Sequence, residues 1–260
     1  MPTQQELEAE FIAFQPELKS FVYRLLAHKQ NMEDVVQETY IKTFNSLDSF
    51  RGESSFKTWV FAIGLNVARN LLKKQQRWHE DYQDNCRTAT YASKQIQQEM
   101  FAITQTSPQG KYVLKEHVDY CFTCMGKTLL LEEQCCVILK EMYAFKVAEI
   151  QEIVGLTEGK VKYHLSNGRK QLQSIFDNRC SLIGKQGMCH QCTELNGMFN
   201  PKQNAQEEVM KLKMAKAAGK ENFEQLFNLR LQLVQSIDPI TSEGFDFHNY
   251  MLEGLPDHST

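Results

Sequence analysis

Apolar residues recur at intervals of three and four along most of this chain of 260 residues. Side chains with that spacing share one face of an α-helix, and no long segment keeps the two-residue alternation of a half-buried strand. One such helix is marked by Leu18, Phe21, Val22, Leu25 and Leu26, which follow Pro16 at a first-turn position. The pattern predicts an all-α protein.

Shifts in composition divide the chain into four parts. From about residue 79 to 106 the chain is rich in Gln, Asp, Asn and Thr, which is typical of a linker, here with one helix near 93–104. Helical periodicity then resumes and continues to about residue 176. We expect a first domain at 1–79, a linker at 80–109, a second domain at 110–177 and a small helical extension at 178–260, irregular from residue 238.

The segment VAEIQEIVGLTEGKVKYHLSNGRKQL, residues 147–172, has the pattern of a helix-turn-helix. A short first helix is expected at residues 147–154. Gly155 then tolerates the positive φ of a tight turn, and Thr157 is a good N-cap for a second helix. In DNA-binding proteins with this motif the second helix enters the major groove. The side chains expected to meet bases and phosphates are Lys160, Lys162, Tyr163, Arg169 and Lys170. An ordinary helical hairpin with a solvated basic face is the alternative.

The segment FRGESSFKTWVFAIGLNVARNLLKKQQRW, residues 50–78, mixes aromatic rings with positive charge, and residues 54–79 contain no acid. Proteins that hold an opened DNA strand need cations along its backbone and rings that replace lost base stacking. The amide of Asn66 can donate to and accept from an extruded base. The candidate contacts here are Lys57, Asn66, Arg69, Lys73, Lys74 and Arg77. The alternative is an aromatic core with a solvated basic face.

The amino-terminal part of the chain is acidic, since residues 1–50 carry eight acidic residues against four basic ones. An acidic helix beside a basic one in a small domain indicates two partners of opposite charge. The net charge of the whole chain is −3, so a surface that binds nucleic acid must be a local cluster of basic residues.

Taken in order, these features resemble the bacterial RNA polymerase sigma factors of the sigma-70 family, in particular the extracytoplasmic-function (ECF) group. The features are the acidic helix, the motif DxxQE at residues 34–38, the stretch FRGESSFKTWVFAIGLN, a polar linker and the helix-turn-helix. The resemblance covers about residues 10–78 and 125–177, and it implies a region 2 bundle and a region 4 helix-turn-helix domain. The chain departs from the family at residues 167–169, where Asn-Gly-Arg stands in place of the frequent Arg-Ala-Arg.

The resemblance implies that Asp34, Gln37 and Glu38 bind the clamp helices of the polymerase's largest subunit, which suits an acidic helix facing a basic surface. It implies that residues 50–77 melt and read the promoter −10 element, with Asn66 near the flipped base, and that the helix-turn-helix reads the −35 element. The expected partners are core RNA polymerase and promoter DNA, and an anti-sigma factor is left open. Such a protein directs promoter-specific transcription initiation, is not an enzyme and requires no cofactor.

Two other classes of protein are weighed against the sigma factor. A stand-alone helix-turn-helix regulator that binds duplex DNA without polymerase has no need of residues 33–78. A sigma-binding adaptor has no need of the -TW…N- stretch. The first residues lack the apolar part of a signal peptide, and no apolar run reaches the roughly 20 residues of a membrane span, so we expect a soluble cytoplasmic protein without membrane insertion.

The cysteines and the extension raise a further question. Cys121 and Cys124 form one CxxC pair and Cys189 and Cys192 form another, and four thiolates suit a tetrahedral Zn²⁺ site. A redox pair and buried free thiols are the alternatives. Two amphipathic segments of the extension, about 204–218 and 220–236, are expected to dock on the sigma domains, which predicts autoregulation.

Overall fold

The computed structural model confirms the all-α prediction, because every regular element among the residues it describes is helical. The structure describes residues 2–73, 77–79, 92–106, 114–179, 223–242 and 245–253, together with positions 81, 85 and 88. Contacts group the chain into two compact units, Met1–Arg77 with Leu130–Gly168 and Trp78–Leu129 with Arg169–Thr260. The four domain ranges expected from composition stay predictions.

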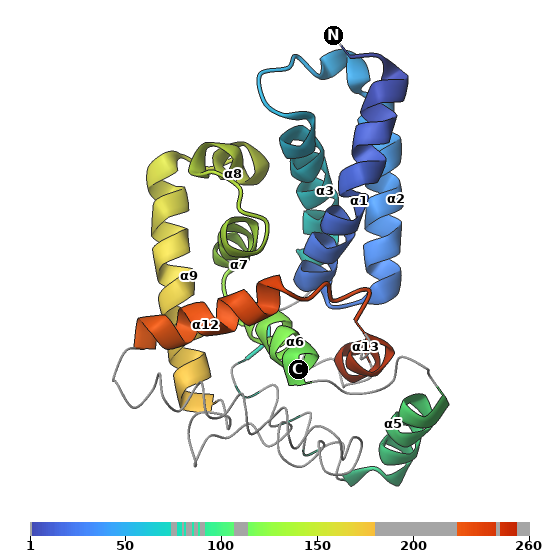
Figure 1. The fold of residues 1–260 in the computed structure, drawn as a ribbon, viewed down its shortest axis with the longest axis vertical. Helices are drawn as coiled ribbons and strands as arrows, with labels where there is room; N and C mark the ends of the chain where they lie inside the picture. The colour runs from blue at the N-terminus through green and yellow to red at the C-terminus, as the bar shows by residue number, and fades with distance from the viewer. Residues whose placement is uncertain are drawn as a thin grey trace. The chain divides into compact units, whose positions relative to one another are not determined.

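A three-helix bundle forms the amino-terminal part of the first unit. Its helices are α1 (Gln4–Leu26), α2 (Lys29–Asn45) and α3 (Phe56–Leu72), which pack side by side (Figure 1), with a short 3₁₀ turn η1 (Leu47–Ser49) after α2. Apolar side chains at helical spacing meet at its centre, where Phe11, Leu18, Phe21, Val60 and Phe61 are fully buried. Burial of these side chains, more than intrinsic helix propensity, holds the bundle together.

Helix α1 begins twelve residues earlier than the position of Pro16 suggested. Thr3 is its N-cap, and a capping box joins the Thr3 side chain to the Glu6 backbone and the Glu6 side chain to the Thr3 backbone. The expected first-turn position for Pro16 is therefore wrong, since Pro16 lies inside the helix. The apolar face continues on the N-terminal side of the proline through buried Phe11 and Phe14, and their packing outweighs the backbone hydrogen bond that the proline cannot make.

Helix α3 begins at Phe56, directly after the pair Ser54 and Ser55. Ser55 is the N-cap, and its hydroxyl accepts a hydrogen bond from the Thr58 amide at 3.1 Å. Gly64 lets α3 approach its neighbours closely, because a Cβ there would lie 3.1 Å from Leu18 Cδ1. Trp59 packs its ring 5.1 Å from that of Phe50, so it belongs to the packing of the bundle.

The helix-turn-helix completes the first unit. It comprises α8 (Val147–Val154) and the beginning of α9 (Glu158–Arg179), and it is preceded in the same unit by α7 (Leu131–Val137) and the π-helical η2 (Ile138–Met142). The predicted bounds of the first helix and the predicted turn are confirmed, since Gly155 has a φ of 70° and its amide bonds to the Gln151 carbonyl at 2.9 Å. Helix α9 turns Val161 and Leu172 inward.

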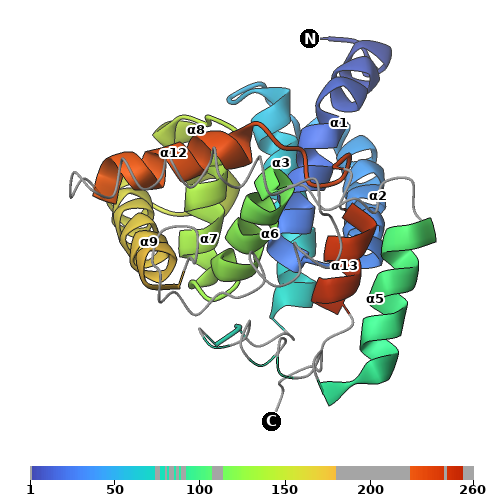
Figure 2. The same cartoon turned by 60° about the horizontal axis from the view of Figure 1, so that its bottom comes forward.

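The second unit contains α5 (Lys94–Thr106), α6 (Leu114–Gly126), the remainder of α9, α12 (Phe223–Gln235) and α13 (Phe245–Glu253). Helix α5 confirms the helix expected inside the linker, and α13 lies beside it (Figure 2). The prediction that the chain is irregular after residue 238 is wrong. Phe245 and His248 are buried on one face of α13, and the His248 ring stacks on Tyr120 at 4.8 Å, so packing makes this short segment helical.

Helix α12 comes from the extension, and it packs on α6. Its apolar side chains Leu226, Phe227, Leu231 and Val234 are buried, which confirms that the second amphipathic segment docks on a helix of the expected region 4 domain. Arg230 is also buried, at 2% exposure, and its Nη1 lies 2.9 Å from Asp177 Oδ1 on α9. The first segment, 204–218, lies outside the described residues.

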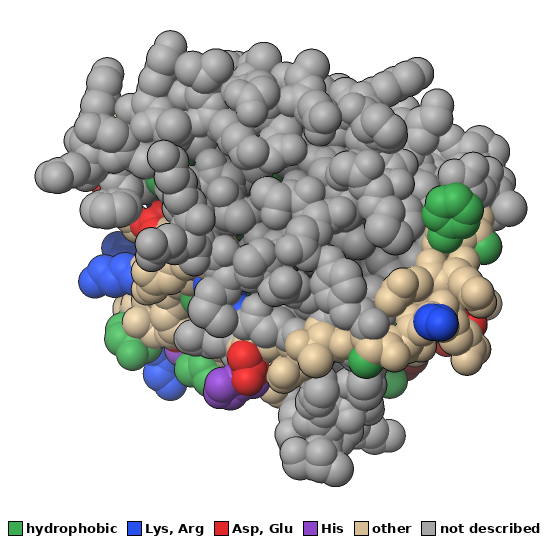
Figure 3. All heavy atoms as spheres, turned by 90° about the horizontal axis from the view of Figure 1, so that it is seen from below, with side chains coloured by type: hydrophobic (Ala, Val, Ile, Leu, Met, Phe, Trp, Pro, Cys, Tyr) green, Lys and Arg blue, Asp and Glu red, His purple; other side chains and the backbone are tan. Residues whose placement is uncertain are grey.

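The surface of the described residues is mixed in chemistry. On the face shown in Figure 3, the described Lys and Arg side chains lie among hydrophobic, acidic and other polar groups. None of the helices that the structure describes is long and apolar enough to cross a membrane.

Candidate nucleic-acid interface

Helix α2 presents an acidic face to solvent. Asp34, Gln37 and Glu38 are exposed, and their spacing of three and four residues puts them on one side of the helix. Ile41 continues the same face one turn further and is 49% exposed, so the acidic face has an apolar member that sequence reasoning missed. Because exposed polar residues surround an unburied aliphatic side chain, this face has the chemistry of a protein-binding surface.

A polar hollow of about 750 Å³ opens where the end of α2 meets the middle of α3. It is lined by Lys42, Asn45, Ser46, Ile63, Asn66, Val67, Arg69, Asn70 and Lys73. Three of these side chains are cations, three are amides and none is an acid. Such a set suits a nucleotide, because cations attract its phosphate and amides pair with the edge of its base.

The structure thus gathers Asn66, Arg69 and Lys73, which the sequence predicted, and adds Lys42 and Asn70. Lys42 was missed because it lies on the helix that was assigned to polymerase binding. The available signal was its place at the end of α2, one turn after Glu38, with which its ammonium pairs at 2.7 Å.

Arg69 orients the amide of Asn66. The Arg69 Nη1 donates to Asn66 Oδ1 at 3.2 Å, one turn apart on α3. A guanidinium can only donate, so the amide oxygen is the acceptor of this bond and the amide NH₂ is directed elsewhere. Asn66 therefore offers hydrogen-bond donors to a base in the hollow.

The remaining residues predicted to contact the −10 element are placed differently. Lys57 pairs with Glu17 at 2.6 Å and does not line the hollow. Arg77 donates to Gln134 Oε1 at 2.6 Å, and burial lowers the pKa of its guanidinium to about 10. Lys74 lies outside the described residues. For Lys57 and Arg77, a contact with DNA would require that these side chains leave their present partners.

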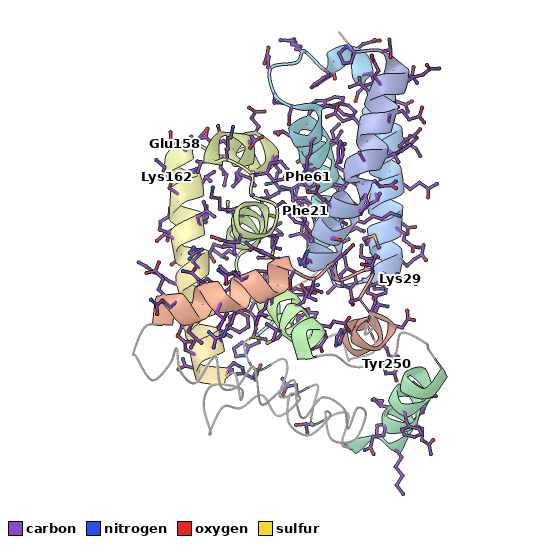
Figure 4. All side chains as sticks on the ribbon, viewed as in Figure 1. Phe21, Lys29, Phe61, Glu158, Lys162 and Tyr250 are labelled. Atoms are coloured by element: carbon purple, nitrogen blue, oxygen red, sulfur yellow. The ribbon has the colours of Figure 1, made fainter. Side chains whose placement is uncertain are left out.

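The beginning of α9 carries the exposed residues expected of a recognition helix. Tyr163 is 63% exposed, and Lys160 and Lys162 are exposed on the same turns. Lys162 pairs with Glu158 at 2.6 Å, and this hydrogen bond lowers the pKa of the Glu158 carboxyl (Figure 4). The pair is exposed, so breaking it costs little.

The later residues of α9 belong to the second unit. Lys170 is exposed, but Arg169 is engaged by α12. The Arg169 guanidinium lies 5.2 Å from the centre of the Phe227 ring, and its Nη2 donates to Asn228 Oδ1 at 3.1 Å. The extension therefore contacts one of the five residues predicted to meet the −35 element.

The departure at residues 167–169 has a packing explanation. A Cβ at Gly168 would lie 2.9 Å from Val137 Cγ2 and 3.2 Å from Glu133 Cβ, so glycine lets α9 lie close against α7. The Asn167 side-chain amide donates to the fully buried Glu133 carboxyl, which also accepts from the Leu130 amide at 3.3 Å. Asn167 and Gly168 therefore hold α9 close against α7.

Two of the cysteines are core residues. Cys135 and Cys136 are fully buried, and burial raises the pKa of both thiols to about 12. A thiol with so high a pKa stays protonated near neutral pH, so it neither binds metal nor reacts.

The expected zinc ligands are only partly described. Cys124 is buried and Cys121 is partly exposed on α6, whereas Cys189 and Cys192 lie outside the described residues. Within the part of the chain that the structure describes, no three potential ligands come together. A zinc site that joins the two pairs stays a prediction.

An acidic helix, a polar hollow between two helices and a helix-turn-helix define a DNA-binding protein that also has a protein partner. The sigma-70 region 2 family matches residues 11–78, and the sigma-70 region 4 family matches residues 121–172. The chain belongs to the sigma-70 family of RNA polymerase sigma factors, in its ECF group, and it directs transcription initiation.

The similar proteins are distant in sequence. The ECF sigma factor SigX of Bacillus subtilis is 24% identical over 63% of this chain and 80% of its own length. The ECF sigma-E factor of Escherichia coli K12 is 27% identical over 63% of this chain and 82% of its own length. A solved structure of the sigma factor RpoE with the anti-sigma factor NepR from Bartonella quintana covers 66% of this chain and 98% of its own, with a TM-score of 0.45 and 20% identity.

Proposed function

We propose that this sigma factor binds core RNA polymerase through the acidic face of α2 and holds an opened promoter strand in the hollow beside it. The observation that carries the proposal is the adjacency of the two surfaces. The acidic face ends at Ile41, and the hollow begins at Lys42 on the same helix. When the polymerase binds this face of α2, the position of the adjacent hollow relative to the polymerase and its DNA is fixed.

The acidic face and its partner attract each other by charge. Asp34 and Glu38 offer carboxylates to a basic surface. Gln37 lies between them on the exposed side of α2, and Ile41 lies about one turn beyond. Complementary charges speed the encounter and fix the orientation, whereas burial of Ile41 adds to affinity.

In the hollow, Lys42, Arg69 and Lys73 neutralise phosphates of the non-paired strand, and Asn66 donates to the edge of the extruded base. Extruding a base costs a few kcal/mol, which these contacts must offset. The strand binds the hollow only when it is unpaired, so the interaction favours the opened promoter over the duplex.

The helix-turn-helix supplies the second DNA contact. Lys160, Lys162 and Tyr163 at the beginning of α9 approach the bases of the −35 element, and Arg169 and Lys170 meet phosphates further along. The protein acts as a DNA-binding initiation factor and not as a catalyst, needs no cofactor for this role, and works in the cytoplasm with promoter DNA and polymerase.

The test is run-off transcription with purified core polymerase on a promoter selected by the holoenzyme from a randomised duplex library. Asp34→Arg with Glu38→Arg should abolish co-elution with core polymerase while circular dichroism shows unchanged helicity. The charge-matched control is Glu10→Arg with Glu152→Arg, two exposed residues on α1 and α8, which should co-elute as the wild type does. Unchanged binding by the first variant would refute the α2 surface.

The hollow is tested separately with a promoter duplex that is already unpaired at the −10 element. Asn66→Ala should weaken the binding of this DNA by the holoenzyme at least as much as it weakens binding of the closed duplex. Asn31→Ala on α2, outside the hollow, is the control. Equal affinities of the wild type and Asn66→Ala for the unpaired DNA would refute the assignment of the hollow.

A further inference from the structure

Helix α12 of the extension packs on the second half of α9, which it crosses in Figure 1. Two contacts between an arginine and a phenylalanine join the helices. On one side, Arg230 Cζ of α12 lies 5.1 Å from the centre of the Phe176 ring of α9. On the other, Arg169 Cζ of α9 lies 5.2 Å from the centre of the Phe227 ring of α12. The contact is therefore reciprocal, and all four residues belong to the second unit.

The contact made by Arg230 is closed to solvent. Arg230 is buried, its Nη1 donates to Asp177 Oδ1 at 2.9 Å, and the Phe176 ring that it covers is buried as well. Undocking α12 would separate this ion pair and expose the apolar face of the helix, and both steps are costly. That face consists of Leu226, Phe227, Leu231 and Val234. The buried contact therefore anchors α12 on α9.

The contact made by Arg169 lies at the edge of the same interface and is open to solvent. Arg169 is half-buried, and Asn228, whose Oδ1 accepts from Arg169 Nη2 at 3.1 Å, is exposed. Phe227 and Asn228 are both uncharged. A phosphate is negatively charged and can accept two parallel hydrogen bonds from a guanidinium, so it binds this group more strongly than a ring and an amide do. Arg169 can therefore exchange α12 for a phosphate while α12 stays anchored.

Arg169 continues a row of cations on the recognition helix. It follows Lys162 by seven residues, so two turns of helix return it to nearly the same side of α9, about 10 Å further along the axis. Lys162 is exposed, and its partner Glu158 is exposed too. While α12 holds Arg169, the helix-turn-helix lacks one of the cations of this row for binding DNA.

We propose that α12 competes with promoter DNA for the Arg169 guanidinium. The proposal rests on the proposed function, in which Arg169 meets a phosphate beyond the bases read by the beginning of α9. In the free protein Phe227 and Asn228 hold the guanidinium. In the complex it turns to the phosphate, while the buried pair of Arg230 and Asp177 keeps α12 in place. The extension thereby lowers the affinity of the helix-turn-helix for duplex DNA without leaving it.

The experiment is a double-mutant cycle between Arg169 and Asn228 in the full chain. The probe is a fluorescent duplex of about 30 base pairs of mixed sequence, because phosphate contacts do not depend on sequence. Asn228→Ala should strengthen binding, measured by anisotropy, by up to about tenfold, the value of one hydrogen bond that no longer competes. In the Arg169→Ala background the same substitution should change nothing, because no guanidinium is left to release.

Gln232→Ala is the matched control, since Gln232 is another exposed amide one turn further along α12, and its affinity should equal that of the wild type. Unchanged affinity in Asn228→Ala, or an equal gain without Arg169, would overturn the competition. Lys160→Ala reports on the helix-turn-helix itself. If it left duplex binding unchanged, the proposed function would be wrong, whereas weaker binding in Lys160→Ala with no gain in Asn228→Ala would refute only the competition.

Nuclear magnetic resonance follows the two arginines directly. Both guanidinium groups lie over rings, whose currents should shift the side-chain proton signals of Arg169 and Arg230 upfield in the free protein. The Arg169 signals, assigned by their absence from Arg169→Lys, should move downfield when the duplex is added, and the Arg230 signals should not move. Arg169 signals that stay upfield in DNA-saturated protein would overturn the exchange. Arg230 signals that move as well would overturn the anchoring of α12.

Discussion

Substitution of glycine by alanine should have opposite effects on stability at the two glycines of α9. Glycine in a helix costs up to about 1 kcal/mol relative to alanine, so alanine should stabilise a helix wherever there is room for a Cβ. At Gly159 nothing lies within 4 Å of the added carbon. At Gly168 the added carbon would lie 2.9 Å from Val137 Cγ2 and 3.4 Å from the Glu133 carbonyl oxygen.

The magnitude at Gly168 follows from what can move. Val137 is fully buried and its side chain is stiff at χ1, and the Glu133 carbonyl belongs to the backbone of α7, so neither neighbour can yield without disturbing the packing. Overpacking of this kind costs about 1–3 kcal/mol, which exceeds the gain in helix propensity. We expect Gly168→Ala to destabilise the first unit by about 1 kcal/mol or more, and Gly159→Ala to stabilise it by up to about 1 kcal/mol.

The assay is urea unfolding followed by the fluorescence of Trp59, which lies in the same unit as both glycines. The midpoint should fall for Gly168→Ala and rise for Gly159→Ala, with unchanged slopes. If Gly168→Ala were as stable as Gly159→Ala or more so, the close approach of α9 to α7 would not be what requires glycine, and the explanation of the Asn-Gly-Arg departure would fail.

Three further predictions concern DNA, the thiols and the buried ion pair. Lys160→Ala should flatten the salt dependence of duplex binding by about 0.9 in the slope of log K against log salt, the value of one lost phosphate contact. Cys135 and Cys136 should resist alkylation at pH 8 in the folded protein, and they should lower stability as pH rises above about 9, because the unfolded thiols ionise there and the folded ones keep their protons until about 12. Arg230→Met should destabilise the second unit by about 3 kcal/mol, because it leaves the Asp177 charge half-buried without its partner.

Each of these has a control. Lys160→Arg keeps the charge and should keep the slope of the salt dependence. If Lys160→Ala also left that slope unchanged, the prediction that Lys160 contacts a phosphate would be wrong. Urea-unfolded protein should alkylate at both cysteines, and equal labelling when folded would contradict their burial. Removing Asp177 as well, as Asp177→Leu, should recover part of the loss in Arg230→Met, and no recovery would show that the ion pair is not the cause.

Several local features of the candidate site were correctly predicted from the sequence. The turn at Gly155 follows from the residues within one turn of it. Helix α8 has the predicted bounds for the same reason. The acidic face needed only the helical spacing of Asp34, Gln37 and Glu38, and the family was carried by short motifs in a fixed order.

Elements whose form depends on distant packing were predicted less well. Pro16 lies inside a helix and residues 245–253 form α13, although the neighbouring sequence predicted otherwise. In both places packing against distant residues determines the structure. Lys57 and Arg77 were predicted to contact DNA because both are basic. In the fold, Lys57 pairs with Glu17 and Arg77 donates a hydrogen bond to Gln134. A local pattern contains no information on which surface a flexible basic side chain will reach.

The order of caps, glycines, charges and apolar spacings along the chain determined that it is helical, that it carries a helix-turn-helix and that it is a sigma factor, because such signals act within a turn or two of helix. Only the tertiary structure decided that Lys42 joins Asn66 and Arg69 in one hollow, that α9 needs glycine where it crosses α7, and that Arg69 holds the end of α8. These contacts join residues that are far apart in sequence, and packing chooses among the many pairings that the same local pattern allows.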